Sequence, residues 1–384
     1  MSVVPTGGQH GGAAAGPSLP WRMASSLVLG VSSCISKTFL FGLNKTEVYG
    51  LQRFLEILDD REDPAKRTKG LITVSNHISV LDDPVMWSVL PLKYPFRPYN
   101  ARWGLGAHDI CFTNRIFASF FTYGQVLPTH RLKHSTNGGL FQPTWAEAIR
   151  LLSSPSSSAT STKAGLTTTP YPKTFSTTGT DVVPSPSVHP TNRHAWVHVF
   201  PEGAVHQHPD LETRYFRWGV SRLILESEPL PDVVPMFIDG FQKVMPEDRA
   251  FPRFLPRIGK HIRVVFGEKV DGEAVFGDLR RRWRELVAAR TRDRLGRVVE
   301  EGGPKEEEEA VVGELRDEEL REGREAREIR IEVARRVRDE VMKLRRRMGY
   351  PEEDPRLGNA ETWAEEKEGK RYKSAVDGSY INQD

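Results

Sequence analysis

Cysteine is nearly absent from this chain of 384 residues, which contains only Cys34 and Cys111. The two lie far apart in segments of different character, so they match no metal-ligand spacing and no disulfide framework. We therefore expect two free thiols. His206 and His208 lack carboxylate or cysteine partners at ligand spacing, and we expect no metal site there.

An excess of charge of one sign is also lacking, because 54 basic residues face 51 acidic ones and the formal net charge is +3. This excess is too small to indicate a nucleic-acid partner. Basic and aromatic residues are nevertheless interleaved, a mixture that suits an anionic lipid surface and equally suits a solvated face around core aromatics. The residues concerned are Lys133, Arg214, Tyr215, Phe216, Arg217, Trp218, Phe251, Arg253, Phe254, Arg257 and Lys260.

Long hydrophobic runs are missing as well. The longest one, residues 27–43, contains Lys37 and several serines and is shorter than the roughly 20 residues that span a bilayer. We expect residues 25–45 to lie in the interface of one membrane leaflet, with a buried core helix as the alternative. Residues 1–24 contain Arg22 as their one basic residue, too few for a cleavable mitochondrial presequence, and we expect a flexible N-terminus.

What the chain does contain is a histidine and an aspartate, His77 and Asp82, five positions apart. An apolar, β-favouring run at residues 71–74 precedes them. Asp83-Pro84 follows as a helix-start signal, with Asp as N-cap and Pro at the first helical position. His77 is therefore expected in a turn between a strand and a helix.

This spacing suits acyl transfer. A base must take the proton of an alcohol as its oxygen attacks a carbonyl, and the imidazole of His77 has a suitable pKa. Asp82 can hold the imidazole tautomer and stabilise the imidazolium, and the substrate's own hydroxyl serves as nucleophile. The helix after Asp83 would also point free N–H groups at developing negative charge. In the structural alternative, His77 bonds only to backbone and Asp83 only caps the helix.

Three further motifs follow in order. Residues 196–203 form a second β-favouring run that opens into the turn Phe200-Pro201-Glu202-Gly203. Residues 124–131 lie between the two runs and end at Arg131, and residues 233–237 read Val-Val-Pro-Met-Phe. Together the four motifs resemble those of the glycerolipid acyltransferase family.

The resemblance implies roles for individual residues. His77 and Asp82 take the places of the family's catalytic dyad, and Glu202 with Gly203 take those that help bind the acceptor. Arg131 stands at the place of the family's arginine-bearing strand motif. We add Asn76 and Asp83 as candidate substrate-binding residues, although Asn76 is expected to position the loop and Asp83 to be mainly structural.

Within that family the sequence resembles the tafazzin branch over roughly the first 270 residues. The shared segments are Thr73 to His77, Asp82-Asp83-Pro84, Asp109 to Thr113, Phe200 to Gly203, Arg217-Trp218-Gly219 and Phe251 to Gly259. This resemblance implies a transacylase that moves acyl chains from phospholipids such as phosphatidylcholine to monolysocardiolipin in cardiolipin remodelling, without coenzyme A or another cofactor. It also implies mitochondrial membranes that face the intermembrane space.

The pattern departs from the wider family after Gly203, where Ala204-Val205 replaces a Thr-Arg pair. A phosphomonoester dianion is well matched by a guanidinium fork, so the missing arginine disfavours a small phosphate-headed acceptor. A lysolipid with diester phosphates, held in the bilayer by diffuse basic charge, is favoured instead. Arg131 is the candidate that could still meet a phosphate, with a surface arginine as the alternative.

Composition divides the rest of the chain. The acyltransferase domain, residues 46–270, is interrupted at residues 153–194 by a Ser/Thr/Pro-rich insert that we expect to be disordered. Residues 271–348 are expected to form a charged helical extension, with helices near 279–299 and 306–348 around a Gly-Gly-Pro break. Residues 349–384 are expected to be a polar tail.

The extension has an apolar seam at Ala334, Val337, Val341, Leu344 and Met348. This seam predicts packing on the chain's own domain or in a homo- or hetero-oligomer, and the surrounding arginines suit an anionic membrane or an acidic partner. A merely solvated helix is the alternative.

These elements predict an α/β fold with a mixed, largely parallel sheet flanked by helices and the site at the strand ends. The predicted strands are residues 71–75, 125–127, 196–200, 233–237 and 262–266. Two other functions stay open. One is an acyl-CoA-dependent lysophospholipid acyltransferase that uses the same dyad; the other is a non-catalytic lipid-binding protein that organises membranes.

Overall fold

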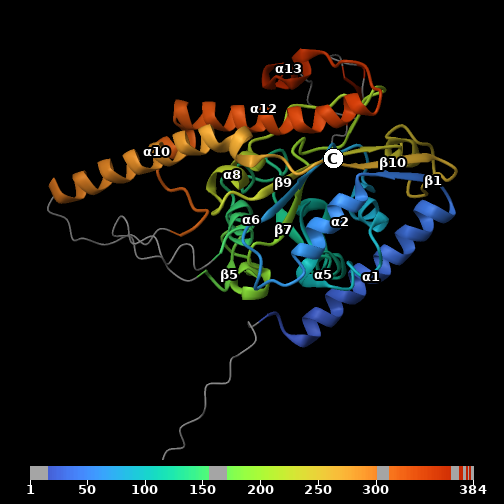
Figure 1. Ribbon diagram of the computed structural model, residues 1–384, viewed down its shortest axis with the longest axis horizontal. Helices are drawn as coiled ribbons and strands as arrows, with labels where there is room; N and C mark the ends of the chain where they lie inside the picture. Colours follow the sequence, from blue (N-terminus) through green and yellow to red (C-terminus); the bar gives the residue numbers. More distant parts are fainter. Residues whose placement is uncertain are drawn as a thin grey trace, which may run out of the picture.

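The computed structural model describes residues 16–154, 171–300, 311–364, 372–374, 378 and 380–381. A seven-stranded sheet in the order β1-β10-β9-β2-β7-β3-β4 forms its centre (Figure 1). Its strands are β1 (Lys45–Tyr49), β2 (Leu71–Val74), β3 (Arg102–Ala107), β4 (Val126–Thr129), β7 (Trp196–Val199), β9 (Asp232–Asp239) and β10 (His261–Phe266). Two small sheets pair β5 (Thr174–Phe175) with β6 (Val183–Pro184), and β8 (His206–Gln207) with β12 (Tyr380–Ile381) and β11 (Tyr372–Lys373).

Helices surround the sheet. They are α1 (Leu19–Gly42), α2 (Leu51–Asp60), α3 (Asp82–Val85), α4 (His108–Cys111), α5 (Arg115–Tyr123), α6 (Pro143–Leu152), α8 (Gly219–Glu226), α9 (Phe241–Val244), α10 (Gly272–Glu300), α11 (Glu318–Glu322), α12 (Arg324–Arg347) and α13 (Ala360–Ala364). Short 3-10 turns are η1 (Met86–Val89), η2 (Pro98–Asn100), η4 (Pro186–Val188), η5 (Pro190–Asn192) and η6 (Pro355–Gly358). Figure 1 shows α10 and α12 on one side of the molecule and α1 on another.

All neighbouring strands of the main sheet run parallel except β9 and β10. The expected α/β fold with a mixed, largely parallel sheet is therefore confirmed, and each of the five predicted strands overlaps an observed one. The central strands β2 and β7 are buried along their whole length. Parallel strands covered on both faces favour continuous apolar runs, and each fully buried Leu, Ile or Val contributes about 1.5–3 kcal/mol.

Helix α1 differs from the expected apolar segment because it begins earlier. Ser18 caps it through a hydrogen bond from the Trp21 N–H, Pro20 lies in its first turn, and the helix has 24 residues. Among the described residues it is the one helix long and apolar enough to cross a membrane. The expected shortfall in length is thus wrong, since residues 19–26 extend the helix.

Part of the Ser/Thr/Pro-rich insert has defined structure, contrary to the expectation of disorder. Residues 155–170 lie outside the described residues, as do residues 1–15 of the N-terminus. Residues 171–194 contain β5, β6, η4 and η5. Tyr171 and Phe175 are buried, and Asp181 accepts hydrogen bonds from the N–H groups of Thr177 and Thr178 at 2.8 and 2.7 Å. Two aromatic anchors and an Asp-centred turn supply the order that composition alone does not indicate.

The C-terminal extension packs on the chain's own domain. Its seam is used there, because Ala334, Val337, Val341 and Leu344 are buried and α12 contacts β9, α8 and α10. One continuous helix over 306–348 is wrong: residues 311–317 are not helical, and α11 and α12 are separate. The Gly-Gly-Pro break lies outside the described residues. Residues 353–364 of the expected polar tail also pack, with Leu357 buried.

Candidate active site

The two main motifs meet at the carboxyl ends of adjacent parallel strands. Val74, the last residue of β2, pairs with Val199, the last residue of β7. His77 and Glu202 each follow their strand by three residues, so both lie at this edge of the sheet. This is the place where ligands bind in open parallel sheets.

His77 and Asp82 form the pair that their spacing predicts. Nδ1 of His77 lies 2.9 Å from Oδ2 of Asp82. The imidazole is 22% exposed, whereas the Asp82 side chain is fully buried. An ionised carboxylate only accepts hydrogen bonds, so Nδ1 carries the proton and Nε2 is the basic nitrogen. None of the described residues hydrogen-bonds to Nε2, and this atom can therefore take a proton from a substrate hydroxyl.

The chain around Asp82 folds onto the carboxylate. Its Oδ2 also accepts hydrogen bonds from the N–H groups of Ile78 and Ser79, at 2.7 and 2.9 Å. Burial raises the pKa of Asp82, and the donors, with His77 foremost, oppose that rise. The expected helix after Asp83 is a single turn in which Asp83 itself has non-helical angles, so it presents no row of free N–H groups to the site.

Glu202 lies behind the dyad and is only 2% exposed. One carboxylate oxygen accepts the backbone N–H of His77 at 2.7 Å, and the other accepts the backbone N–H of Arg214 at 2.9 Å. Burial raises the pKa of Glu202 to about 7, against the opposing effect of these two N–H groups. Glu202 therefore links the β2 turn to the segment that follows β8.

Aromatic and backbone contacts hold His77 from the β7 side. The ring of Phe200 stacks on the imidazole with centroids 4.2 Å apart. The N–H of His206 donates to the His77 carbonyl at 2.8 Å. Phe200 of the Phe-Pro-Glu-Gly motif therefore fixes the imidazole ring of His77, and His206, just after the motif, fixes its backbone.

Asn76 and Asp83 face protein groups. Asn76 is 1% exposed, and its amide exchanges two hydrogen bonds of 2.9 Å with the backbone of Ile238 in β9. Asp83 pairs with Arg102, whose Nε donates at 2.9 Å, and makes no helix cap. Both fit positioning of the loop better than contact with a substrate.

Arg131 was the predicted candidate for phosphate contact, and the structure adds Arg217 as a second one with different partners. Arg131 forms an ion pair with Asp109, so its charge is already opposed. Gly203 has a positive φ of +69°, and a Cβ there would come within 2.8 Å of the Arg217 side chain. Arg217 is exposed, and no carboxylate of the described residues pairs with it. Gly203 thus leaves room for an exposed guanidinium beside the Glu202 turn.

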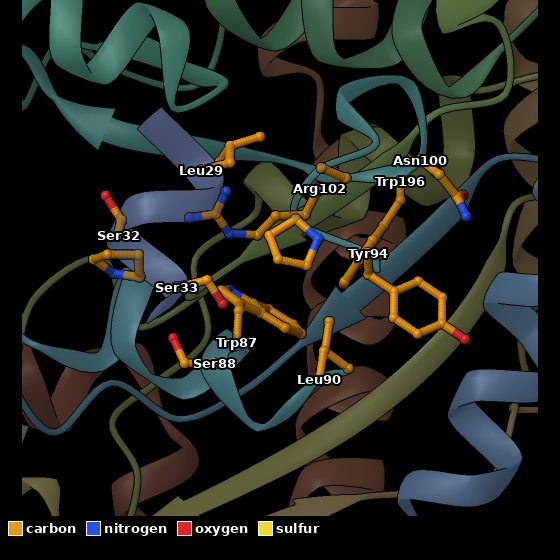
Figure 2. A pocket seen from close by; sticks show the side chains of 13 residues that line it. Leu29, Ser32, Ser33, Trp87, Ser88, Leu90, Tyr94, Asn100, Arg102 and Trp196 are labelled. Atoms are coloured by element: carbon orange, nitrogen blue, oxygen red, sulfur yellow. The ribbon is translucent and has the colours of Figure 1, made fainter. Parts of the chain in front are cut away.

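Two cavities lie beside α1, and neither is lined by His77, Asp82 or Glu202. Figure 2 shows the smaller one, about 60 Å³, where Trp87, Leu90 and Tyr94 face Leu29 and the α1 serines. It is too small for an acyl chain, because ligand pockets usually measure about 300–1,000 Å³. The larger cavity, about 600 Å³, lies between the start of α1, α5, β4 and the ordered part of the insert.

Comparison with known proteins identifies the family. Residues 55–239 match the family model described as Acyltransferase. The chain is 34% identical to the tafazzin of Saccharomyces cerevisiae over 351 residues, which cover 89% of this chain and 83% of that protein. It is 32% identical to the Drosophila melanogaster tafazzin over 69% of this chain and 56% of that protein. An Arabidopsis thaliana N-acylphosphatidylethanolamine synthase is 33% identical over 59% of this chain and 64% of that protein.

The chain belongs to the tafazzin family. It is therefore an enzyme, a phospholipid acyltransferase. The resemblance that the four motifs indicated is confirmed at the level of the family.

For this member of the tafazzin family, sequence reasoning missed two parts of the site. The packing of Arg217 on Gly203 had a signal, since Arg217-Trp218-Gly219 is among the shared segments, but no motif indicated which side chain it would meet. The hydrogen bond from the Arg214 N–H to Glu202 had no signal in the sequence, because any residue type can supply a backbone N–H.

Proposed function

We propose that this enzyme is a coenzyme A-independent transacylase that moves acyl chains from phospholipids such as phosphatidylcholine to lysophospholipids, monolysocardiolipin in particular. The observation that carries the proposal is the His77–Asp82 pair, with Nδ1 held at 2.9 Å by a buried carboxylate and Nε2 left open. Membership of the tafazzin family supports the choice of substrates.

In the proposed reaction, Nε2 of His77 takes the proton of the acceptor hydroxyl as that oxygen attacks the ester carbonyl of the donor. Asp82 stabilises the imidazolium that forms. The tetrahedral intermediate then expels the donor's glycerol oxygen, which takes the proton back from His77. One ester bond forms and one of similar energy breaks, so no high-energy donor is needed and the dyad serves both directions.

Glu202 and Arg217 take different parts in the proposed site. Glu202 is buried and engaged with two N–H groups, so it positions His77 instead of touching the acceptor. Arg217 is exposed beside Gly203, and we assign it to the diester phosphate of the acceptor. Arg131 is the weaker candidate, because Asp109 already opposes its charge.

Helix α1 supports association with one leaflet, because its apolar residues face outward. Its buried positions are mainly small, Ser25, Gly30, Ser33 and Ser36. The ammonium group of Lys37 turns inward and donates to the carbonyls of Ser88 and Leu90 at 3.0 and 3.1 Å. The outer face carries the exposed side chains Leu19, Met23, Leu27, Val31 and Ile35.

An apolar outer face with the helix's lysine turned inward fits a helix that lies in the membrane interface. Further exposed apolar side chains lie beside α1. Ile116 and Phe117 are on α5, which contacts α1. Phe254 is on the loop that reaches the end of α1, where the Gly259 N–H donates to the Leu43 carbonyl. The tafazzin relatives support mitochondrial membranes, on the surfaces that face the intermembrane space, as the place of action.

The test follows labelled acyl groups from phosphatidylcholine to monolysocardiolipin in liposomes without coenzyme A, for wild type and His77→Ala. Transfer by wild type and its loss in the variant are expected. Activity that appears only with added acyl-CoA would favour the acyl-CoA-dependent enzyme. A His77→Ala protein with full biological activity would favour a non-catalytic lipid-binding protein.

A further inference from the structure

Helix α12 carries three buried arginines, Arg330, Arg338 and Arg345, with exposed fractions of 0%, 5% and 0%. Arg330 donates to the carbonyls of Leu320 and Arg321, so it holds the extension itself together. Arg338 and Arg345 reach across to the segment between β8 and α8. The extension is thus attached to a segment that adjoins the active site.

Arg338 makes the attachment nearest to the dyad. Its Nη2 donates to the carbonyl of Thr213 at 2.9 Å, and its Nε donates to the carbonyl of Arg214 at 3.2 Å. Its other contacts are two parallel bonds to Glu353, at 2.5 and 2.7 Å. The guanidinium is 7% exposed and the carboxylate 15%. Bidentate pairs of this kind fix geometry as well as adding energy.

Two hydrogen bonds connect the held segment to the catalytic turn. Arg214, whose carbonyl Arg338 binds, donates its own N–H to Glu202 at 2.9 Å. The other oxygen of Glu202 accepts the N–H of His77 at 2.7 Å. The Thr213 carbonyl, which Arg338 also binds, and the Arg214 N–H belong to one peptide unit, and this unit is therefore two hydrogen bonds from the backbone of the proposed base.

We propose that Arg338, held by Glu353, is a positioning residue of the active site, which makes the C-terminal extension part of the catalytic unit. This inference rests on the proposed function, because it assumes that His77 is the base. These two residues lie beyond residues 55–239, which match the acyltransferase family model. A displacement of about 1 Å of a reacting group costs on the order of 10²-fold in rate, so small shifts at Arg214 reach kcat.

The test variant replaces both members of the pair, Arg338→Met with Glu353→Met. Removing one partner would leave the other buried and unpaired, whereas replacing both by apolar residues of similar volume is often close to neutral for stability. The bonds to the Thr213 and Arg214 carbonyls are lost in either case. Arg338→Lys keeps the charge without the fork and serves as the conservative variant.

Arg330→Met is the matched control, because Arg330 is a buried arginine of the same helix whose side chain hydrogen-bonds to carbonyls of the extension and packs over the Trp283 and Phe141 rings, with no bond to Thr213 or Arg214. Transfer kinetics of each full-length variant are measured with phosphatidylcholine and monolysocardiolipin in liposomes, together with Tm. We expect kcat of the double variant to fall about 10–100-fold with KM within about twofold. Arg338→Lys should recover part of the loss, and Arg330→Met should lower Tm while leaving kcat within about twofold.

Hydrogen exchange gives a readout that does not depend on activity. Peptides that cover residues 75–79 should exchange faster in the double variant than in wild type, and at the wild-type rate in Arg330→Met. Unchanged exchange at 75–79, or a kcat that falls with Tm alike in both variants, would overturn the positioning role. Wild type and His77→Ala are assayed alongside: an inactive wild type or an active His77→Ala refutes the proposed function separately.

Discussion

Replacement of Asp82 by Asn separates catalysis from folding in this enzyme. The amide oxygen can take the place of Oδ2 and keep the hydrogen bonds from Ile78 and Ser79. The amide nitrogen then takes the place of Oδ1, which has no hydrogen-bond partner among the described residues. Asp82→Asn therefore removes the charge beside His77 while leaving the turn folded.

The magnitude follows from the 2.9 Å between Nδ1 of His77 and Oδ2 of Asp82. With an effective dielectric constant near 20, the attraction between imidazolium and carboxylate at this distance is about 4–6 kcal/mol. The amide dipole retains part of it, and each 1.4 kcal/mol changes a rate about tenfold. We expect kcat for acyl transfer in liposomes to fall about 10²- to 10⁴-fold.

The stability of Asp82→Asn should be equal to or higher than that of wild type, although its kcat is lower. Because burial raises the pKa of Asp82 above its ordinary value of 3.8, the folded protein holds this proton more tightly than the unfolded chain. Wild-type stability therefore falls as pH rises above 3.8, and Asn does not share this loss. The Tm of Asp82→Asn should equal or exceed that of wild type at pH 8, and the difference should shrink toward pH 4.

Asp83→Asn is the matched control, since Asp83 is the adjacent carboxylate and pairs with Arg102 instead of His77. It should lower Tm and leave kcat within about fivefold. The dyad argument is refuted if Asp82→Asn keeps kcat within about fivefold of wild type. A large fall in Tm at pH 8 would instead show that Asp82 acts by holding the fold.

Three further predictions concern other parts of the site and surface. Glu202→Gln offers one oxygen to two N–H donors, so kcat should fall about tenfold. Because burial raises the pKa of Glu202 to about 7, the wild type loses stability as pH rises from 4.5 to about 7. The Tm of the variant should fall less than that of wild type over this pH range. Arg217→Met should raise KM for lysophospholipids about 3–10-fold, and a larger effect of Arg131→Met would contradict the phosphate assignment. Leu27→Asp should weaken flotation with liposomes, whereas Ile331→Asp, on the exposed side of α12, should not.

The extent to which sequence predicts this site depends on how far apart the partners lie in the chain. The dyad was predictable because His77 and Asp82 share one turn, and both strands that flank it are apolar runs. Strands β1 and β3 escaped prediction: Lys45–Tyr49 is an edge strand with no buried residue, and Arg102–Ala107 contains two glycines. The bond from Arg338 to the Arg214 carbonyl joins residues 124 positions apart, and no local pattern records it.

The orientation of α1 had a signal that composition obscures. Counting serines in residues 27–43 suggested a diluted apolar helix, but the serines gather on one face. Leu19, Met23, Leu27, Val31 and Ile35 recur every fourth residue, the spacing of one helical stripe, and this stripe is the exposed one. In soluble proteins the apolar stripe faces the core, and the inverse arrangement marks a surface for a protein or a membrane, which supports the proposed lipid-facing helix.

On the proposed function, the same helix connects the membrane to the turn that holds His77 and Asp82. Lys37 holds the carbonyls of Ser88 and Leu90, only a few residues after Asp82, and α1 contacts both α3 and η1. Helix α1 and the dyad therefore belong to one packed unit. If His77 is the base and α1 lies in the membrane interface, as proposed, the base meets hydroxyl and ester groups at a set depth in the leaflet. On the proposed function, substrates are then selected partly by where the bilayer places their glycerol oxygens, and the enzyme needs no deep pocket for each acyl chain.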